Sequence, residues 1–225
     1  MNRDQLNLKD PNECLSLFTV ADYFRCKGAC KVAKQALEER EKDFSPSLRI
    51  RIARTFSPQF DHFVEGAAKD LLKNPLGSFN AEDEANLDRR EVAALMKARE
   101  ICMHFRRTFA FFPPETVQKF DFAPPCNPNR HKKCIGEWNA VWVERVPPRL
   151  LHSVYPMDPL DISFYLERLE AEYQSVMPQC LKNAFEALEQ AEYADEGPLR
   201  FEMRALQGLV SAIRAYHSEV YRSAY

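Results

Sequence analysis

Three prolines in the last third of the sequence each stand at the head of an apolar stripe with helical spacing. Pro159 follows Asp158, a residue that caps helices well, and Pro178 and Pro198 head two further stripes. Proline suits the first turn of a helix, where its missing N–H is not needed, and breaks a helix elsewhere. The chain must therefore start a new helix near each proline, and the short connections favour an antiparallel array. The stripes comprise Ile162, Tyr165, Leu166, Leu169 and Tyr173; Leu181, Phe185 and Leu188; and Leu199, Met203 or Leu206, Leu209 or Val210, Ile213, Tyr216 and Val220.

Helical spacing also recurs in the first third. It predicts a hairpin of two helices, over about residues 12–24 and 29–42. The next stretch is ambiguous, because apolar residues alternate at a period of two over 48–52 and then return to helical spacing. We predict two helices there, beginning at Pro46 and Pro58, since each proline follows a serine that can cap. A linker follows over 74–80.

The middle of the chain combines a long helix with an irregular segment. Apolar residues predict one helix from Ala81 to about Phe112. Two Pro-Pro pairs, several asparagines and Gly136 predict an irregular loop over 113–136. A short helix around Trp138 is then expected to end at Pro147 and Pro148.

These elements predict an all-α fold, an irregular array of about eight helices in two layers with one long central helix. The first two helices are expected to bury their apolar faces against the long helix. We divide the chain into residues 1–73 and a helical region, 74–225, that contains the loop at 113–136.

Composition disfavours a nucleic-acid or membrane partner. The 31 Lys and Arg residues against 33 Asp and Glu give a net charge of -2, which provides no global field for nucleic acid or an anionic membrane. The seven cysteines are odd in number and irregularly spaced, and no signal peptide or membrane-spanning stretch is present, so we expect reduced thiols in the cytoplasm or nucleus.

The strongest candidate for chemistry lies in the predicted loop. Cys126, His131 and Cys134 form the pattern C-x4-H-x2-C, and thiolate and imidazole are ligands that zinc prefers. Three ligands leave a structural zinc site one short, and the fourth could come from His152, Cys102 or His104. The pattern lacks the tight C-x2-C pairs typical of zinc sites, so the default interpretation is ordinary loop residues with a part-buried thiol and no cofactor.

Other reactive groups favour plain structural roles. Cys26 and Cys30 are one helical turn apart, but Gly28 between them favours a turn, and Cys30 is expected to be a buried, inert thiol. No nucleophile sits at a glycine-rich elbow, and no phosphate-binding, zinc-protease or hydrolase motif occurs. We therefore predict no catalytic residues and no enzyme.

The segment Leu15 to Arg40, LSLFTVADYFRCKGACKVAKQALEER, resembles the end of fungal BTB/POZ domains. The matching positions are Phe18, Val20, Ala21, Asp22, Tyr23, Phe24, Cys30, Ala33 and Leu37. Downstream, the cysteine-bearing stretch with EWNAVWVERV and LLH is similar to the Trp-rich tail of some members. The resemblance implies that 1–73 are BTB-like C-terminal helices whose preceding β-core was lost or truncated. It also implies homodimerisation and recruitment of ubiquitin ligases or transcriptional partners.

Together these observations predict a non-enzymatic protein-protein interaction module that binds a protein partner, including a second copy of itself. A nucleic-acid or membrane partner is not favoured. The alternative is a zinc-stabilised regulatory or nucleic-acid-associated helical domain centred on Cys126, His131 and Cys134. A third hypothesis is an α-helical enzyme without a recognised motif.

Overall fold

The chain is helical throughout the part that the computed structural model describes. That part comprises residues 11–73, 79–112, 115–121, 124–152, 156–169, 173, 176–193 and 198–224. No strand occurs among these residues, so the predicted all-α fold class is confirmed. Within the same ranges, every helix is too short or too polar to cross a bilayer.

The helices form two consecutive groups along the chain. The first group comprises α1 (Pro11–Tyr23), α2 (Lys27–Glu39), the 3-10 turn η2 (Glu41–Asp43), α3 (Pro46–Thr55), α4 (Phe63–Lys73) and α5 (Ala81–Asn86). The second comprises α6 (Arg89–Phe111), α7 (Glu115–Gln118), α8 (Pro128–Leu150), the 3-10 turn η4 (Pro159–Asp161), α9 (Ile162–Glu167), α10 (Pro178–Tyr193) and α11 (Pro198–Ala224).

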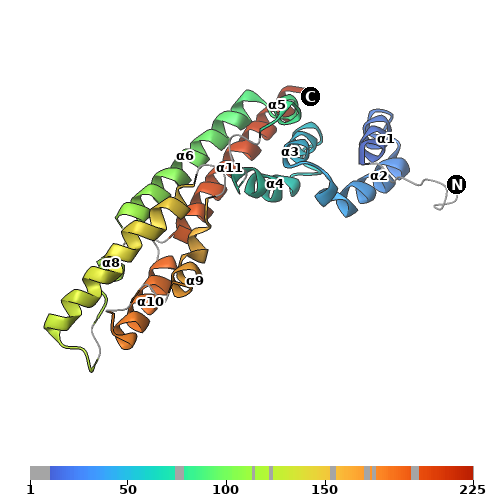
Figure 1. The fold of residues 1–225 in the computed structure, drawn as a ribbon. Helices are drawn as coiled ribbons and strands as arrows, with labels where there is room; N and C mark the ends of the chain where they lie inside the picture. Colours follow the sequence, from blue (N-terminus) through green and yellow to red (C-terminus); the bar gives the residue numbers. More distant parts are fainter. Residues whose placement is uncertain are drawn as a thin grey trace.

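The molecule is elongated, with α6 and α11 side by side along its middle (Figure 1). They are antiparallel, because Arg90 pairs with Glu219 and Arg106 with Glu202, each at 2.7 Å. The hairpin of α1 and α2 lies at one end, and α8, α9 and α10 form the other (Figure 1). α6 is the expected long helix with 23 residues, but α8 matches it with 23 and α11 exceeds it with 27.

The long helix predicted from Ala81 is interrupted at Leu87 and Asp88. Asp88 takes an extended conformation and its carboxylate accepts a hydrogen bond from the Arg90 N–H at 2.9 Å. Glu91 closes the capping box by accepting from the Asp88 N–H at 2.7 Å. The cap residue therefore ends the short α5 and starts α6 afresh.

The prolines mark most helix starts as predicted. α10 begins at Pro178, α11 at Pro198 and α3 at Pro46, where the Ser45 hydroxyl accepts from the Leu48 N–H at 3.3 Å. At Pro159 a 3-10 turn precedes α9. The prediction for Pro58 is wrong: turns occupy residues 56–62 and α4 begins only at Phe63.

The predicted loop over 113–136 is shorter than expected, because α8 already begins at Pro128. The Asn127 side chain caps it by accepting from the Arg130 N–H at 3.0 Å. The prediction that Pro147 ends this helix is also wrong, and both prolines lie inside its last turns. Pro147 cannot bond the carbonyl of Val143, but the Val143 side chain is 62% exposed, so that side of the helix faces solvent.

Two apolar cores divide the molecule, and α6 contributes to both. Leu95 and Ala98 belong to the core shared by α1–α4 and α11, whereas Phe105 and Phe109 belong to the core formed with α8 and α10. Buried tryptophans dominate the second core. The Trp142 indole N–H donates to the Ala110 carbonyl at 2.9 Å, which fixes α8 against α6.

The α1–α2 hairpin is present as predicted, but its apolar face packs mainly on a different neighbour. Phe18 of α1 contacts Phe56 and Phe60 edge to face, with ring centroids 4.8 and 5.2 Å apart. These two rings belong to the α3–α4 connection, and α3 and α4 stand between the hairpin and α6 (Figure 1). The expectation that the hairpin would cover the long helix is therefore not met.

Candidate metal centre

Four metal-binding side chains meet at the end of the molecule where α8 and α10 begin. Cys126, His131, Cys134 and Cys180 are all buried, and their ligand atoms all lie within 4.8 Å of one another. Cys126 comes from the turn before α8, the next two from the first turns of α8, and Cys180 from the first turn of α10.

The start of α8 positions two of the four groups. Asn127 and Pro128 fix where the helix begins, as cap and first residue. His131 and Cys134 then stand three residues apart, which places their side chains on one face of the helix. Cys126 immediately precedes the cap, so the turn into the helix directs its thiol to the same place.

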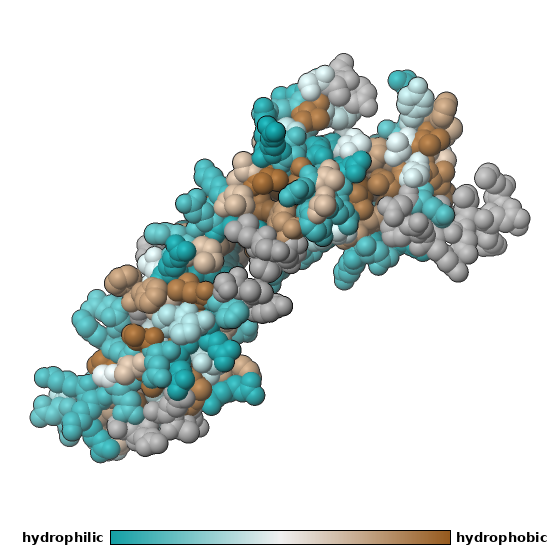
Figure 2. Space-filling view, turned by 45° about the horizontal axis from the view of Figure 1, so that its top comes forward, coloured by the Kyte–Doolittle hydropathy of each residue, from teal (hydrophilic) through white to brown (hydrophobic). Residues whose placement is uncertain are grey.

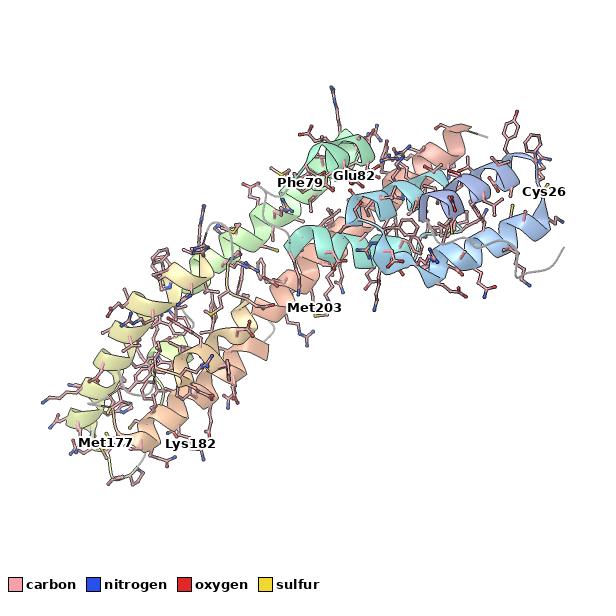
Figure 3. The ribbon with its side chains drawn as sticks, turned by 45° about the vertical axis from the view of Figure 1, so that its right-hand side comes forward. Cys26, Phe79, Glu82, Met177, Lys182 and Met203 are labelled. Atoms are coloured by element: carbon pink, nitrogen blue, oxygen red, sulfur yellow. The ribbon has the colours of Figure 1, made fainter. Side chains whose placement is uncertain are left out.

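The start of α10 supplies the fourth group. Pro178 is its first residue, and the Leu181 N–H donates to the Met177 carbonyl at 2.9 Å. The Met177 N–H in turn donates to Cys134 Sγ at 3.4 Å, which ties this helix start to α8. Figure 3 shows Met177 at the end of the molecule where the two helices meet. Cys180 is thereby held against His131.

The His131 ring is oriented by a backbone group. Its Nε2 lies 2.8 Å from the Phe120 carbonyl oxygen, which can only accept, so Nε2 carries the proton. Nδ1 then presents its lone pair toward Cys180 Sγ, 3.5 Å away. A ligating histidine commonly donates its other N–H to a carbonyl, which fixes the tautomer and strengthens the ligand. The Phe120 ring meets the imidazole edge to face, with centroids 5.3 Å apart.

Burial, together with the neighbouring thiols, raises the pKa of Cys126 to about 11. Burial is the largest cause, followed by hydrogen bonds with Cys180 and Cys134 and by repulsion between the thiolates. The Cys126 thiol is therefore protonated at neutral pH unless a cation compensates it. A divalent ion would reverse this preference, because it binds the deprotonated sulfur.

The separations suit a tetrahedral ion. A zinc-sulfur bond of about 2.3 Å places two sulfurs of a tetrahedron about 3.8 Å apart. Ligand atoms within 4.8 Å of one another reach that arrangement with small side-chain rotations.

Aromatic rings surround the site. Trp138, which is 1% exposed, contacts Phe120 edge to face and stacks on Tyr173.

The structure brings together the three site residues predicted from the sequence. Cys126 lies in a turn, but His131 and Cys134 are helical and buried rather than residues of an irregular loop. The predicted candidates for the fourth position are not in the cluster. Cys102 is buried on α6, and His104 and His152 are exposed.

Sequence reasoning missed Cys180 as a partner of this cluster. It is separated from His131 by 49 positions and follows the proline that heads a helix. That proline predicted the helix start correctly, but only the packing of α10 on α8 makes the thiol a neighbour of the other three groups. Cys26 and Cys30 stand apart from the cluster, with Cys26 exposed and Cys30 part-buried.

The arginines of α3 make intramolecular contacts. Arg49 pairs with Asp70 and lies 3.5 Å from a Glu41 oxygen, while Arg54 pairs with Glu91. Arg51 donates to the Asn86 side chain at 3.2 Å. These arginines therefore connect α3 to its neighbours within the chain.

Comparison with protein-family models, with curated proteins and with solved structures found no match to this chain. The functional assignment consequently depends on the chemistry of the four side chains and on the surfaces around them.

Proposed function

We propose that the chain is a non-catalytic helical module that binds other proteins and whose α8–α10 end is held together by one zinc ion. The observation that carries the proposal is the convergence of three thiols and one imidazole, from segments far apart in sequence, within 4.8 Å. Soft thiolates with imidazole favour zinc over magnesium, calcium or manganese.

A structural role is favoured over a catalytic one by the number of ligands. Four protein groups complete the tetrahedron that zinc prefers, whereas catalytic zinc keeps a position open for water or substrate. All four groups are buried within the part of the chain that the structure describes, which favours a structural ion over one that a substrate reaches. The ion would join the turn before α8, α8 itself and α10, which also pack together in the second apolar core.

Protein binding is the role implied by the resemblance of Leu15 to Arg40 to fungal BTB/POZ domains. The exposed end of α1 supports it, because Val20, Tyr23 and Phe24 are 54%, 81% and 67% exposed there. Aromatic residues are enriched at protein interfaces, and adjacent exposed apolar side chains commonly mark one. The role of the metal would then be to stabilise the remainder of the module.

Metal analysis of the purified full chain tests the proposal. Protein prepared under reducing conditions should contain about one zinc per chain, and Co²⁺ in its place should give the absorption bands of tetrahedral thiolate coordination. Cys134→Ser and Cys180→Ser should each lose most of the zinc. Cys26→Ser changes an exposed thiol outside the cluster and should retain it. A parent protein that takes up no zinc after loading and desalting excludes the zinc role.

A further inference from the structure

The end of the molecule that carries the thiol cluster also carries a patch of positive charge. Arg130, Lys132 and Lys133, here called the basic cluster, flank His131 on the first turns of α8 and are all exposed. None of the three takes part in an ion pair within the described residues, unlike Arg106 or Lys119. Basic side chains at a helix start oppose the helix dipole, so helix stability does not explain them.

A groove of opposite charge lies between the end of α9 and α10. It has a volume of about 590 Å³ and an apolar floor that includes Leu181 and Phe185. Glu167, Glu186 and Glu189 stand along it and are exposed. This surface is here called the acidic groove. Its one cation, Lys182, lies 3.6 Å from Glu186, and the other two carboxylates have no cationic partner among the described residues.

The two features share one end of the chain. The Met177 N–H donates to Cys134 Sγ at 3.4 Å, which holds the start of α10 beside the start of α8. Figure 3 shows Met177 and Lys182 together at this end, and Figure 2 shows this end covered largely by hydrophilic side chains. A two-fold axis near this end would place the basic cluster of each copy against the acidic groove of the other, so the contact forms twice.

We propose that this end of the molecule is a homodimerisation surface. The basic cluster of one copy lies against the rim of the acidic groove of a second copy, and the reverse contact forms at the same time. The proposal rests on the proposed function, because it names the protein partner of the zinc-stabilised end. A basic peptide or a polyanion would neutralise only one of the two charged features, whereas a second copy neutralises both.

Sedimentation equilibrium of the zinc-loaded full chain, over a range of concentration and salt, tests this partner. The parent protein should dimerise at low salt, and its dimerisation affinity should fall as the salt concentration increases. Lys132→Glu with Lys133→Glu should weaken dimerisation by at least about tenfold, and so should Glu167→Lys with Glu189→Lys. An equimolar mixture of these two variants should form a heterodimer, because both of its contacts pair opposite charges. Lys27→Glu with Lys31→Glu, on the distant α2, should dimerise as the parent does.

A parent that stays monomeric at low salt overturns the proposal, including where a lysine-rich peptide binds the groove or heparin binds the basic cluster instead. A dimer that neither charge reversal weakens also overturns it. Zinc content measured in the same samples separates this result from the proposed function. A zinc-loaded monomer contradicts the dimer alone, whereas a charge-dependent dimer without zinc contradicts the metal assignment alone.

Discussion

His131 Nδ1 and Cys180 Sγ lie 3.5 Å apart, although 49 positions separate the two residues in the chain. The contact joins the first turns of α8 and α10, whose starts are set by Pro128 and Pro178. Cys126 and Cys134 complete the cluster from the same side of α8. A metal ion bound here would therefore link two helices to each other. Its removal should lower the free energy of unfolding.

Chelation should lower the stability of the chain. Zinc binds the folded cluster and not the unfolded chain. It therefore stabilises the folded state by about 4 kcal/mol when the free zinc concentration exceeds the dissociation constant a thousandfold. Thermal melting with and without a strong chelator measures this effect. Cys180→Ser should melt near the chelated parent and respond little to the chelator, whereas Cys26→Ser should behave as the parent does. Equal responses in both variants would contradict the cluster as the binding site.

Zinc affinity should rise with pH. Without metal, burial and the neighbouring thiols raise the pKa of Cys126 to about 11, so zinc must displace a proton from this thiol at neutral pH. Competition with a chelator of known affinity, repeated at several pH values below 9, should show tighter binding at each higher pH. An affinity independent of pH would exclude thiolate ligation.

The raised pKa of Cys126 should make the metal-free chain lose folding stability at alkaline pH. A folded-state pKa raised from 9.0 to about 11 contributes stability that is complete below pH 9 and is lost as pH rises through 11, because the unfolded chain releases the proton first. Chelated protein should therefore lose stability across this window more steeply than zinc-loaded protein, whose thiols are already deprotonated. Urea unfolding with both forms at pH 8, 9 and 10 measures the difference.

The sequence predicted helix starts well where a proline followed a capping residue and nothing tertiary opposed it. Pro46 after Ser45 shows this, since both the cap and the helix are present. Pro58 after Ser57 offered the same local signal, yet α4 begins at Phe63. There the chain turns so that Phe56 and Phe60 can pack on Phe18, and that burial outweighs the local preference.

The residues of the candidate site could also be predicted only in part from the sequence. Cys126, His131 and Cys134 lie within one short stretch, so their spacing alone indicated a common site. Cys180 could not be added from spacing, because its position depends on how α10 packs against α8. Cys102, His104 and His152 have a suitable residue type for a fourth ligand, but the packing of the helices does not bring them to the cluster.

Trp142 should be a main support of the core that holds the thiol cluster. It is 2% exposed, and its indole N–H donates to the Ala110 carbonyl at 2.9 Å. Trp142→Phe leaves that buried carbonyl without its donor and creates a void, which together should cost about 2–4 kcal/mol. Urea unfolding measures the loss. Val143→Ala alters the neighbouring residue, 62% exposed, and should change stability by less than about 0.5 kcal/mol.

Glu91 should be the most sensitive polar residue between α6 and α11. Its carboxylate accepts from His217 Nε2 at 2.7 Å and pairs with Arg54, and Glu91 and His217 side chains are each only 1% exposed. Glu91→Ala leaves a buried imidazole without its acceptor and removes the carboxylate that pairs with the part-buried Arg54. Removing one partner of a buried pair typically costs about 3–5 kcal/mol, so urea unfolding should show a loss of that size.

The matched control for Glu91 lies on the same pair of helices. Glu219 of α11 contacts Arg90 of α6 at the same 2.7 Å, but the two side chains are 68% and 67% exposed. Water screens such a pair, so Glu219→Ala should cost less than about 1 kcal/mol. Because the two contact distances are equal, the difference in stability loss between the two variants measures the effect of burial. Losses of similar size in both would show that Glu91 is solvated in solution and that the buried contact with His217 does not hold α11 in place.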